Sequence, residues 1–400
     1  MIDDLKFELE DESRKGARIK VVGVGGAGSN AVGRMYEEGL PGVEFYVMNT
    51  DAQALGASRV PNKLQIGARI TGGLGAGSNP EVGRQSALED TDTILDILEG
   101  ADIVFVTAGM GGGTGGGAAP VVARLARQLD ALTIAIVTRP FGFEGGRRMA
   151  QAEAGIAELA ASVDILTTIP NERLLRVAPR GTSMAQAFRM ADDVLRQAVE
   201  GISELILLPG LINLDFSDIR AAISNMGHAL IGMATASGPD AAMEAARGAI
   251  SSPLLEDTRI AGARQILMNI CGSTEIGLYE VSEACSIVRE ASGAADLQLN
   301  FGVITRPDMG DTVKVTVIAT GFPVAHELTV PAIEALPPGE FFAARQSGEM
   351  AAHPEAEFVP EAPLPLAPEP ALDAVMAAAE EVYEDELDVP AYLRQGKLVG

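Results

Sequence analysis

Lysine is absent from the central part of this 400-residue chain, because none occurs between Lys63 and Lys314. No Gly-Lys-Ser or Gly-Lys-Thr follows any of its glycine-rich segments, which excludes a Walker-type P-loop. Any phosphate held by the central part of the chain must therefore be held by backbone amides, arginine or a metal ion.

Positive charge is scarce overall, since the formal net charge at pH 7 is −25. Nucleic-acid binding proteins carry basic surfaces and anionic lipid attracts cations, so we expect no nucleic-acid partner and no adhesion to anionic membranes. The two cysteines, Cys271 and Cys285, fit no metal spacing and predict buried, reduced thiols in a cytoplasmic protein. His228 and His326 have no acidic or cysteine partner at ligand spacing, so we expect no metal held by side chains. No apolar run approaches the roughly 20 residues of a membrane span, and the N-terminus has no apolar signal core, so we expect no membrane insertion.

Glycine, in contrast, is abundant in a run at 109–117, which directly follows the apolar stretch 102–107. We expect a strand to enter a loop with almost no side chains, and a helix to open at 118–122. Backbone N–H groups of such a loop can approach an anion closely, and a helix N-terminus adds partial positive charge. The run therefore predicts a phosphate cradle.

A second glycine segment, at 23–28, matches the G-x-G-x-x-G pattern between a predicted strand and a helix that we expect from Ser29 or Asn30. By itself this pattern is typical of an NAD(P)-dependent oxidoreductase, which stays an alternative. That alternative predicts an acidic residue at the tip of the second strand, about 20 residues on. The tip here, at 49–51, comes later than that.

A third glycine segment, at 71–80, precedes a helix predicted at 81–88. We expect all three segments at the carboxyl ends of neighbouring parallel strands. Three such loops would fit one triphosphate encircled by backbone better than one pyrophosphate.

Predicted strands alternate with helical segments in the first half of the chain. This order predicts a parallel sheet with helices on both faces. The strands are expected at 18–22, 45–48, 102–107, 132–138 and 165–169.

A long helix is predicted at 184–208, before a break at Pro209 and Gly210. The region after it alternates like half-buried strands, which predicts a second α/β domain with a more antiparallel sheet over 222–321. Its neighbourhood holds expected helices at 216–226 and 281–291 and expected strands at 275–280, 297–305 and 312–320.

The chain changes character after Phe322. Residues 331–400 contain 14 acidic and three basic residues, and 331–385 is rich in Ala, Pro and Glu. Such a segment cannot bury enough apolar surface to fold alone, so we expect a disordered linker. Apolar residues return at 387–394, which fits a docking peptide and equally a frayed helix or a remnant without function.

Two pairs of residues four apart have both a binding and a structural interpretation. Phe188 and Asp192 share a helix face, where a ring could stack on a base and a carboxylate could accept from guanine N1–H and N2–H. In isolation such a phenylalanine is more often in the core and such an aspartate solvated. Glu144 could accept ribose hydroxyls and Arg148 could face phosphate, or the two could form a surface ion pair.

Asn213, Asp215 and Asp218 lie at a loop-to-helix junction. The two carboxylates would project together and could orient and polarise an attacking water. The structural interpretation makes Asp215 an N-cap and lets Asp218 complement the helix dipole. The helix at 184–208 spans roughly 35 Å at about 1.5 Å per residue. If it crosses the domain, these carboxylates lie opposite the glycine segments, and a site divided in this way is completed only by a head-to-tail contact, which propagates into a filament.

Taken together, these segments resemble the FtsZ family, the bacterial tubulin-like GTPases of cell division, over nearly the whole chain. The ordered motifs are Gly-Val-Gly-Gly-Ala-Gly-Ser-Asn at 23–30, Asn-Thr-Asp-Ala-Gln-Ala-Leu at 49–55, Gly-Leu-Gly-Ala-Gly-Ser-Asn-Pro-Glu-Val-Gly-Arg at 73–84, Gly-Gly-Gly-Thr-Gly at 111–115, Pro-Phe-Gly-Phe-Glu-Gly at 140–145, and Asn-Leu-Asp-Phe-Ser-Asp at 213–218. The tail at 388–394 looks like the family's C-terminal docking peptide.

The resemblance implies an α/β, tubulin-like fold, in which a Rossmann-type parallel-sheet GTPase domain is joined by a long central helix to a smaller α/β domain with a mixed sheet. The expected parts are a flexible extension at 1–16, the GTP-binding domain at 17–183, the central helix and catalytic loop at 184–221, the second domain at 222–321, the acidic linker at 322–386 and the docking peptide at 387–400.

The resemblance also assigns roles to residues. Guanine would be read by Asn30, Asn171, Phe188 and Asp192, ribose by Glu144, and the γ-phosphate by Ala76 and Gly77. Arg148 and the loop at 111–117 would hold the phosphates. The full set of implied nucleotide-binding residues is Gly25, Gly26, Ala27, Gly28, Ser29, Asn30, Ala76, Gly77, Gly111, Gly112, Gly113, Thr114, Gly115, Gly116, Glu144, Arg148, Asn171, Phe188 and Asp192.

The implied catalytic residues are Asn213, Asp215 and Asp218, acting on the nucleotide of the neighbouring subunit. The implied ligands are GTP or GDP, Mg²⁺ held mainly by phosphates and water, and a monovalent cation. The implied partners are other copies of the chain and, through the tail, membrane-tethering and regulatory proteins at the mid-cell division site. The implied docking residues are Asp388, Val389, Pro390, Ala391, Tyr392, Leu393 and Arg394.

One position departs from the family pattern, which usually has a second threonine in the glycine signature where this chain has Gly116. A lost hydroxyl removes one phosphate hydrogen bond, of roughly 1–3 kcal/mol to a charged acceptor. A catalytically weak tubulin-like scaffold is therefore a further alternative.

Overall fold

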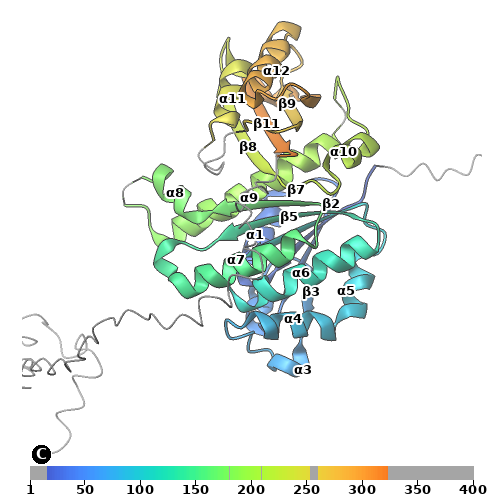
Figure 1. Ribbon diagram of the computed structural model, residues 1–400, viewed down its shortest axis with the longest axis vertical. Coiled ribbons are helices and arrows are strands. Elements are labelled where there is room, and N and C mark those ends of the chain that lie inside the picture. The colour runs from blue at the N-terminus through green and yellow to red at the C-terminus, as the bar shows by residue number, and fades with distance from the viewer. Residues whose placement is uncertain (1–15, 180, 209, 253–259, 323–400) are drawn as a thin grey trace, which may run out of the picture. The chain divides into compact units, whose positions relative to one another are not determined.

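The computed structural model describes residues 16–322, apart from 180, 209 and 253–259, and all of these belong to one compact unit (Figure 1). Two sheets organise it. The larger has seven parallel strands in the order β3-β2-β1-β4-β5-β6-β7. Their bounds are β1 Ile19–Val24, β2 Val43–Asn49, β3 Asn62–Gln65, β4 Ile103–Gly109, β5 Leu132–Arg139, β6 Ile165–Pro170 and β7 Gly227–His228.

Both faces of this sheet are covered by helices, as the alternation of strands and helices predicts. Val21, Phe105 and Ile134 point to one face, which packs against α1 (Gly25–Glu38), α9 (Met184–Leu207) and α10 (Phe216–Ile223). Their neighbours Val22 and Val104 point to the other face. That face packs against α4 (Pro80–Glu89), α5 (Thr91–Leu98), α6 (Gly113–Gln128) and α7 (Gly146–Ala160). Shorter helices are α2 Ala52–Ala57, α3 Ala68–Thr71 and α8 Asn171–Val177.

The second sheet is mixed and has the order β10-β9-β11-β8. Its strands β9 and β10 are parallel, whereas β11 is antiparallel to both β9 and β8. One face contributes Ile231, Leu267 and Ile318 to the core around α9, and the other packs against α11 and α12. The bounds are β8 Leu230–Ser237, α11 Ala241–Ile250, β9 Gln265–Gly272, α12 Leu278–Ser292, β10 Gln298–Thr305 and β11 Thr312–Thr320.

The strand predicted at 275–280 is wrong, because helix α12 begins at Leu278. The strand that precedes α12 is β9, which alternation of polar and apolar residues does not predict. From Ile266 to Gly272 every residue of β9 is buried, so the strand carries no alternation of polar and apolar residues. The expected strand at 312–320 is confirmed, and the expected helix at 216–226 ends earlier, at Ile223.

Helix α9 runs from the carboxyl edge of the seven-stranded sheet to its amino edge. Near its start, the ring of Phe188 lies 5.5 Å from that of Phe141, which follows β5. Near its end, Leu207 lies beside Gly42, which precedes β2. The predicted long helix is thus confirmed, and its 24 residues span about 36 Å.

An ion-pair ladder along α9 connects the two sheets. Arg196 pairs with Glu38 at the end of α1 and with Glu200, both at 2.9 Å. Lys314 of β11 pairs with Glu200 at 3.3 Å and with Glu204 at 3.0 Å. Glu204 is 8% exposed at its side chain, so this end of the ladder is desolvated.

Candidate nucleotide site

The first two glycine segments follow adjacent strands, since β1 and β4 are paired. Contrary to expectation, much of each segment is already helical. Helix α1 begins at Gly25 and not at Ser29 or Asn30, and helix α6 begins at Gly113 and not within 118–122. Glycine disfavours helix in isolation, so tertiary packing must set these starts. A Cβ at Gly25 would lie 2.9 Å from Gly115 N.

Several other glycines allow the same close approach of backbones. A Cβ at Gly28 would collide with the carbonyl oxygen of Thr107 in β4, and one at Gly117 with that of Pro80 in α4. Ala27 lies against Gly109, where an added Cβ would be 2.6 Å from the alanine methyl. The glycines therefore serve close packing as well as ligand access.

Both helix starts leave backbone donors free for a ligand. The first N–H groups of a helix have no intrahelical acceptor. The N-cap residues Val24 and Gly112 make no side-chain cap, and neither helix has an acidic residue in its first turn. Two uncapped N-termini at the ends of neighbouring strands offer backbone donors to which an anion can bind.

The third glycine segment joins the other two by a different route from the one expected. It follows α3 and not a strand, and β3 is the edge strand of the sheet. The segment folds back along the end of β2, where Gly75 N donates to Thr50 O at 3.3 Å. Ala76 then lies against the start of α6, 2.9 Å from a Cβ placed on Gly113. All three segments therefore meet at one edge.

Open space faces part of this cradle. A Cβ on Gly26, Gly77 or Gly112 would meet no atom within 4 Å, and one on Gly116 would have Gly111 N as its nearest neighbour at 4.0 Å. Thr114 is differently placed, because its hydroxyl bonds the buried hydroxyl of Thr50 at 2.7 Å. The cradle offers room for a ligand at its glycines.

Arg148 lies beside this cradle, since a Cβ on Gly111 would collide with its backbone oxygen and side chain. Its guanidinium pairs with Glu144 at 3.1 Å, as the surface ion-pair interpretation predicts. The same carboxylate accepts a hydrogen bond from Phe141 N at 2.8 Å. Glu144 therefore has a structural role whether or not it contacts a ribose.

At the other end of the candidate site, an aromatic side chain is exposed and a carboxylate is buried, which is the reverse of what these residue types favour. Phe188 is 40% exposed and meets Phe141 edge to face, and Phe141 in turn stacks on Phe143. Asp192, one helical turn on, is only 8% exposed. An exposed ring above a buried carboxylate suits a planar ligand better than a core or a solvated helix face.

Two buried polar atoms among the predicted binding residues have no hydrogen-bond partner. They are the hydroxyl oxygen of Ser29 in α1 and the amide oxygen of Asn171 at the start of α8. A buried polar atom left unpaired costs about 1–3 kcal/mol, so these atoms are suited to a ligand. Asn30, next to Ser29, is exposed.

Burial raises the pKa of Asp192 from its usual value to about 6. The Arg34 guanidinium opposes this rise, with its Nε 3.3 Å from Asp192 Oδ2. Sequence reasoning missed Arg34. The available signal was its place on α1, one helical turn beyond Asn30.

The remaining predicted residues lie at the opposite edge of the sheet. Asp215 occupies the N-cap of α10 but makes no side-chain cap bond, and Asp218 is in the first turn. Asn213 Oδ1 accepts from Gly210 N at 2.5 Å. Arg220 of α10 pairs with Asp130, just before β5, so this helix lies at the amino edge. The structure therefore brings the glycine, phenylalanine and Asp192 group together and keeps Asn213, Asp215 and Asp218 apart from it.

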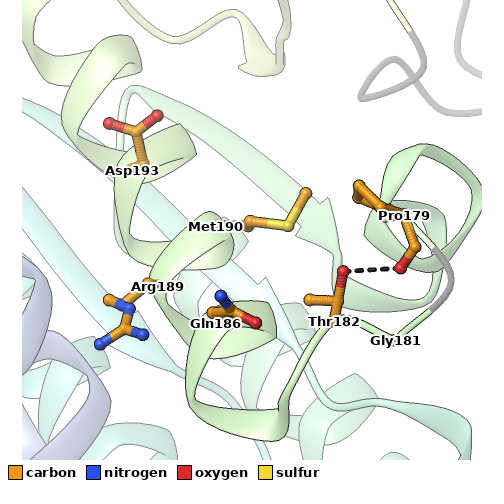
Figure 2. Close-up of a pocket in the computed structure, with 7 residues that line it drawn as sticks. All are labelled: Pro179, Gly181, Thr182, Gln186, Arg189, Met190 and Asp193. Carbon is orange, nitrogen blue, oxygen red and sulfur yellow. Dashed lines mark hydrogen bonds between the residues drawn. The ribbon is translucent and has the colours of Figure 1, made fainter.

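A cavity of about 550 Å³ lies beside the first half of α9 (Figure 2). Met190 points toward Pro179 and Thr182, and Thr182 Oγ1 donates to Pro179 O at 2.7 Å. None of its lining residues was predicted to bind a nucleotide. They are Pro179, Gly181, Thr182, Gln186, Arg189, Met190 and Asp193.

The described part of the chain holds no helix that is both long and apolar enough to cross a bilayer. Within residues 16–322, outside the gaps, no group of three or more His, Cys, Asp or Glu side chains is arranged to hold a metal ion. The acidic linker and the docking residues 388–394 lie outside the described residues, as does nearly all of the N-terminal extension.

Known proteins share both halves of this architecture. Residues 18–179 match the GTPase domain of the Tubulin/FtsZ family, and residues 227–323 match the FtsZ family C-terminal domain. A structure of FtsZ from M. jannaschii, described as an empty dimer, is 40% identical with a TM-score of 0.72, covering 77% of this chain and 89% of that one. CetZ2 from Haloferax volcanii, described as a GTPγS-bound protofilament, is 22% identical with a TM-score of 0.67, covering 77% and 94%. The two matched domains and the 40% identity over most of both chains show that this protein, with its tubulin-like GTPase domain, belongs to the FtsZ family.

Proposed function

We propose that this chain is a GTPase that assembles head to tail into filaments of the bacterial division ring, with each GTP hydrolysed at the contact between two subunits. One observation carries the proposal. The anion cradle lies at the carboxyl edge of the seven-stranded sheet, whereas Asp215 and Asp218 lie beyond the far end of α9. A helix of about 36 Å separates them, so one subunit cannot bring both to the same phosphate.

In this proposal the nucleotide lies across the starts of α1, α6 and α8. Backbone N–H groups at 25–28 and 111–115 bind the phosphates, Gly116 lies beside them, and Ala76 and Gly77 contact the γ-phosphate. Phe188 stacks on the guanine, while Asp192, Asn30 and Asn171 bind its polar edge. The unpaired oxygens of Ser29 and Asn171 support this placement, because a bound nucleotide supplies donors to buried acceptors.

Asp215, Asp218 and Asn213 would complete the site from the neighbouring subunit. The missing cap bond leaves the Asp215 carboxylate free to orient a water for attack on the γ-phosphorus. Mg²⁺, held mainly by phosphate oxygens and water, would offset phosphate charge in a region without lysine, and a monovalent cation is a further candidate. Loss of the γ-phosphate would then loosen the contact between subunits.

Exposed apolar side chains support an end-to-end contact. At the nucleotide edge, Leu74 is 88% and Phe143 61% exposed. At the other end, Leu278 and Tyr279 are the first two residues of helix α12 and are 81% and 85% exposed. Leu211 is 68% exposed. Such residues mark contact surfaces when they gather together, and a contact between two different faces extends into a filament.

The tail is proposed to recruit membrane-tethering and regulatory partners at mid-cell, through the docking residues 388–394. The acidic linker would set the distance between filament and membrane. This part of the proposal depends on the sequence alone.

The test is phosphate release from GTP with Mg²⁺ at increasing protein concentration, read beside right-angle light scattering. A shared site requires a rate per subunit that rises with concentration together with scattering. Full-rate turnover in a dilute, unassembled sample would overturn the shared site. Filaments without phosphate release would favour the weak scaffold, and NAD(P) binding without a response to GTP would favour the oxidoreductase.

A further inference from the structure

Arg34 reaches the base end of the candidate site from helix α1. Its Nε lies 3.3 Å from Asp192 Oδ2 on α9. The arginine side chain is 35% exposed and the aspartate side chain 11%. A mostly buried carboxylate therefore has its cationic partner at the rim of the site, one helical turn beyond Asn30.

We propose that Arg34 is a positioning residue for base recognition, which keeps the Asp192 carboxylate ionised and turned toward the bound purine. This inference rests on the proposed function, because it assumes that Asp192 binds the guanine edge. Guanine presents two donors there, N1–H and N2–H. Only an ionised carboxylate offers two acceptor oxygens to both, since protonation converts one oxygen into a donor.

Asp192 needs the positive charge of Arg34 because burial and that charge act on its pKa in opposite directions. Burial raises its pKa to about 6, so the group titrates within one to two pH units of neutrality. The positive charge of Arg34 is the influence that opposes burial. Without it the carboxylate would take up a proton at a higher pH.

Other charged groups near this part of α9 are engaged elsewhere. On α1, Glu38 pairs with Arg196 at 2.9 Å, and on α9 itself Asp193 pairs with the same arginine at 2.9 Å. On the elements that carry Phe141 and Asn171, Glu144 pairs with Arg148, and Glu172 accepts from Gly142 N at 2.8 Å. Arg189 lies three residues before Asp192 and is therefore its neighbour along the helix, but the ion pair with Asp192 and the charge that opposes its burial come from Arg34. Arg34 is thus the cation placed to act on Asp192.

The experiment measures GDP and IDP affinity of the full chain by titration calorimetry from pH 5.5 to 8.5, so that hydrolysis does not interfere. IDP carries hypoxanthine, which lacks the N2 amino group. Arg34→Met should bind GDP about fivefold more weakly than the parent at pH 6 and nearly equally at pH 8.5, because a carboxylate with a higher pKa is still ionised there. The preference for GDP over IDP should fall in parallel at pH 6. Because the Arg34 side chain is 35% exposed, the variant should fold, and circular dichroism checks this.

Arg34→Lys keeps the charge and should restore most of the parent profile. Asp192→Asn should weaken GDP binding and leave, between pH 5.5 and 7, only the pH dependence that titration of the terminal phosphate of GDP contributes. If Asp192→Asn leaves GDP affinity unchanged, the proposed nucleotide site fails. If Asp192→Asn weakens binding while Arg34→Met follows the parent at every pH, or loses affinity equally at every pH, the role of Arg34 alone is overturned.

Discussion

Lys314 of β11 and Glu204 of α9 form a 3.0 Å ion pair that joins the second sheet to the central helix. The same ammonium reaches Glu200, one helical turn away, at 3.3 Å. Because Glu204 is nearly buried, Lys314 and the more distant Arg306, at 3.7 Å, are the cations that compensate its carboxylate. Lys314 thus contacts two carboxylates, one of which, Glu200, also pairs with Arg196 at 2.9 Å.

We therefore expect Lys314→Met to lower the free energy of unfolding by about 1–3 kcal/mol, since it leaves a desolvated carboxylate poorly compensated. Urea denaturation at pH 7.5 measures the change. Lys63→Met is the matched control, because Lys63 is exposed and donates only to a backbone oxygen at 2.6 Å. Equal stability of the two variants would contradict the importance of the ladder.

Asp192→Asn should stabilise the nucleotide-free protein at neutral pH while it weakens nucleotide binding. Because burial raises the pKa of Asp192 to about 6 in the folded protein, ionisation of this carboxyl group lowers the free energy of unfolding. This cost is absent below about pH 4, where the group is protonated in both the folded and the unfolded chain, and it grows as the pH rises to about 6. The expected gain at pH 7.5 is about 1–3 kcal/mol. Chemical denaturation from pH 4.5 to 8 should show a gain that rises up to about pH 6 and stays constant above it, and Asp96→Asn, at an exposed position, is the control variant.

Gly116→Ser should fold normally and bind nucleotide more tightly. The nearest atom to an added Cβ is 4.0 Å away, and a hydroxyl there adds a donor to the cradle. One hydrogen bond to phosphate of about 1.5 kcal/mol corresponds to a roughly tenfold lower Kd. Gly117→Ser is the contrasting variant, since its Cβ would collide with Pro80 O and should destabilise the protein. Unchanged affinity in a folded Gly116→Ser variant would mean that position 116 does not face phosphate.

Asp215→Ala should bind GTP, hydrolyse it at least about 100-fold more slowly, and form filaments that persist. Its stability should change little because the side chain makes no cap bond. Asp240→Ala is the matched control, since Asp240 is also an uncapped N-cap, of α11. Phosphate release and light scattering measure both, and normal turnover in Asp215→Ala would refute the shared site.

A chain that ends at Phe322 should still polymerise with GTP but lose partners recruited by the tail. Co-sedimentation with membrane vesicles from the source cells compares it with the full chain. Leu393→Glu in the full chain keeps the linker and should show the same loss. Retained membrane recruitment in both variants would argue against docking through 388–394.

The parallel sheet, the long helix and the clustering of glycine segments were predictable from sequence, because alternation of strands and helices, apolar spacing and glycine content are local signals. The start of α6 at Gly113 was not, because packing of Gly117 against Pro80 overrides the low helix propensity of glycine. Nor was strand β9, whose buried run has no alternation.

The burial of Phe188 and Asp192 could not be predicted from residue type either. Phe188 is exposed and Asp192 buried, the opposite of the usual preferences of these residue types, because the packing of α9 against its neighbours sets their burial. Arg34 escaped prediction because its importance arises from a contact between helices far apart in the chain. Ordinary propensities fail where a ligand completes the environment.

The proposed phosphate cradle is built from main-chain amides, whereas the proposed base end holds a carboxyl group whose pKa burial raises to about 6. Amide donors keep the same protonation across the whole physiological range. In such a site, acidification of the cell would leave the donors of the cradle unchanged while it protonates the group that selects the base, so that selectivity among purines would weaken.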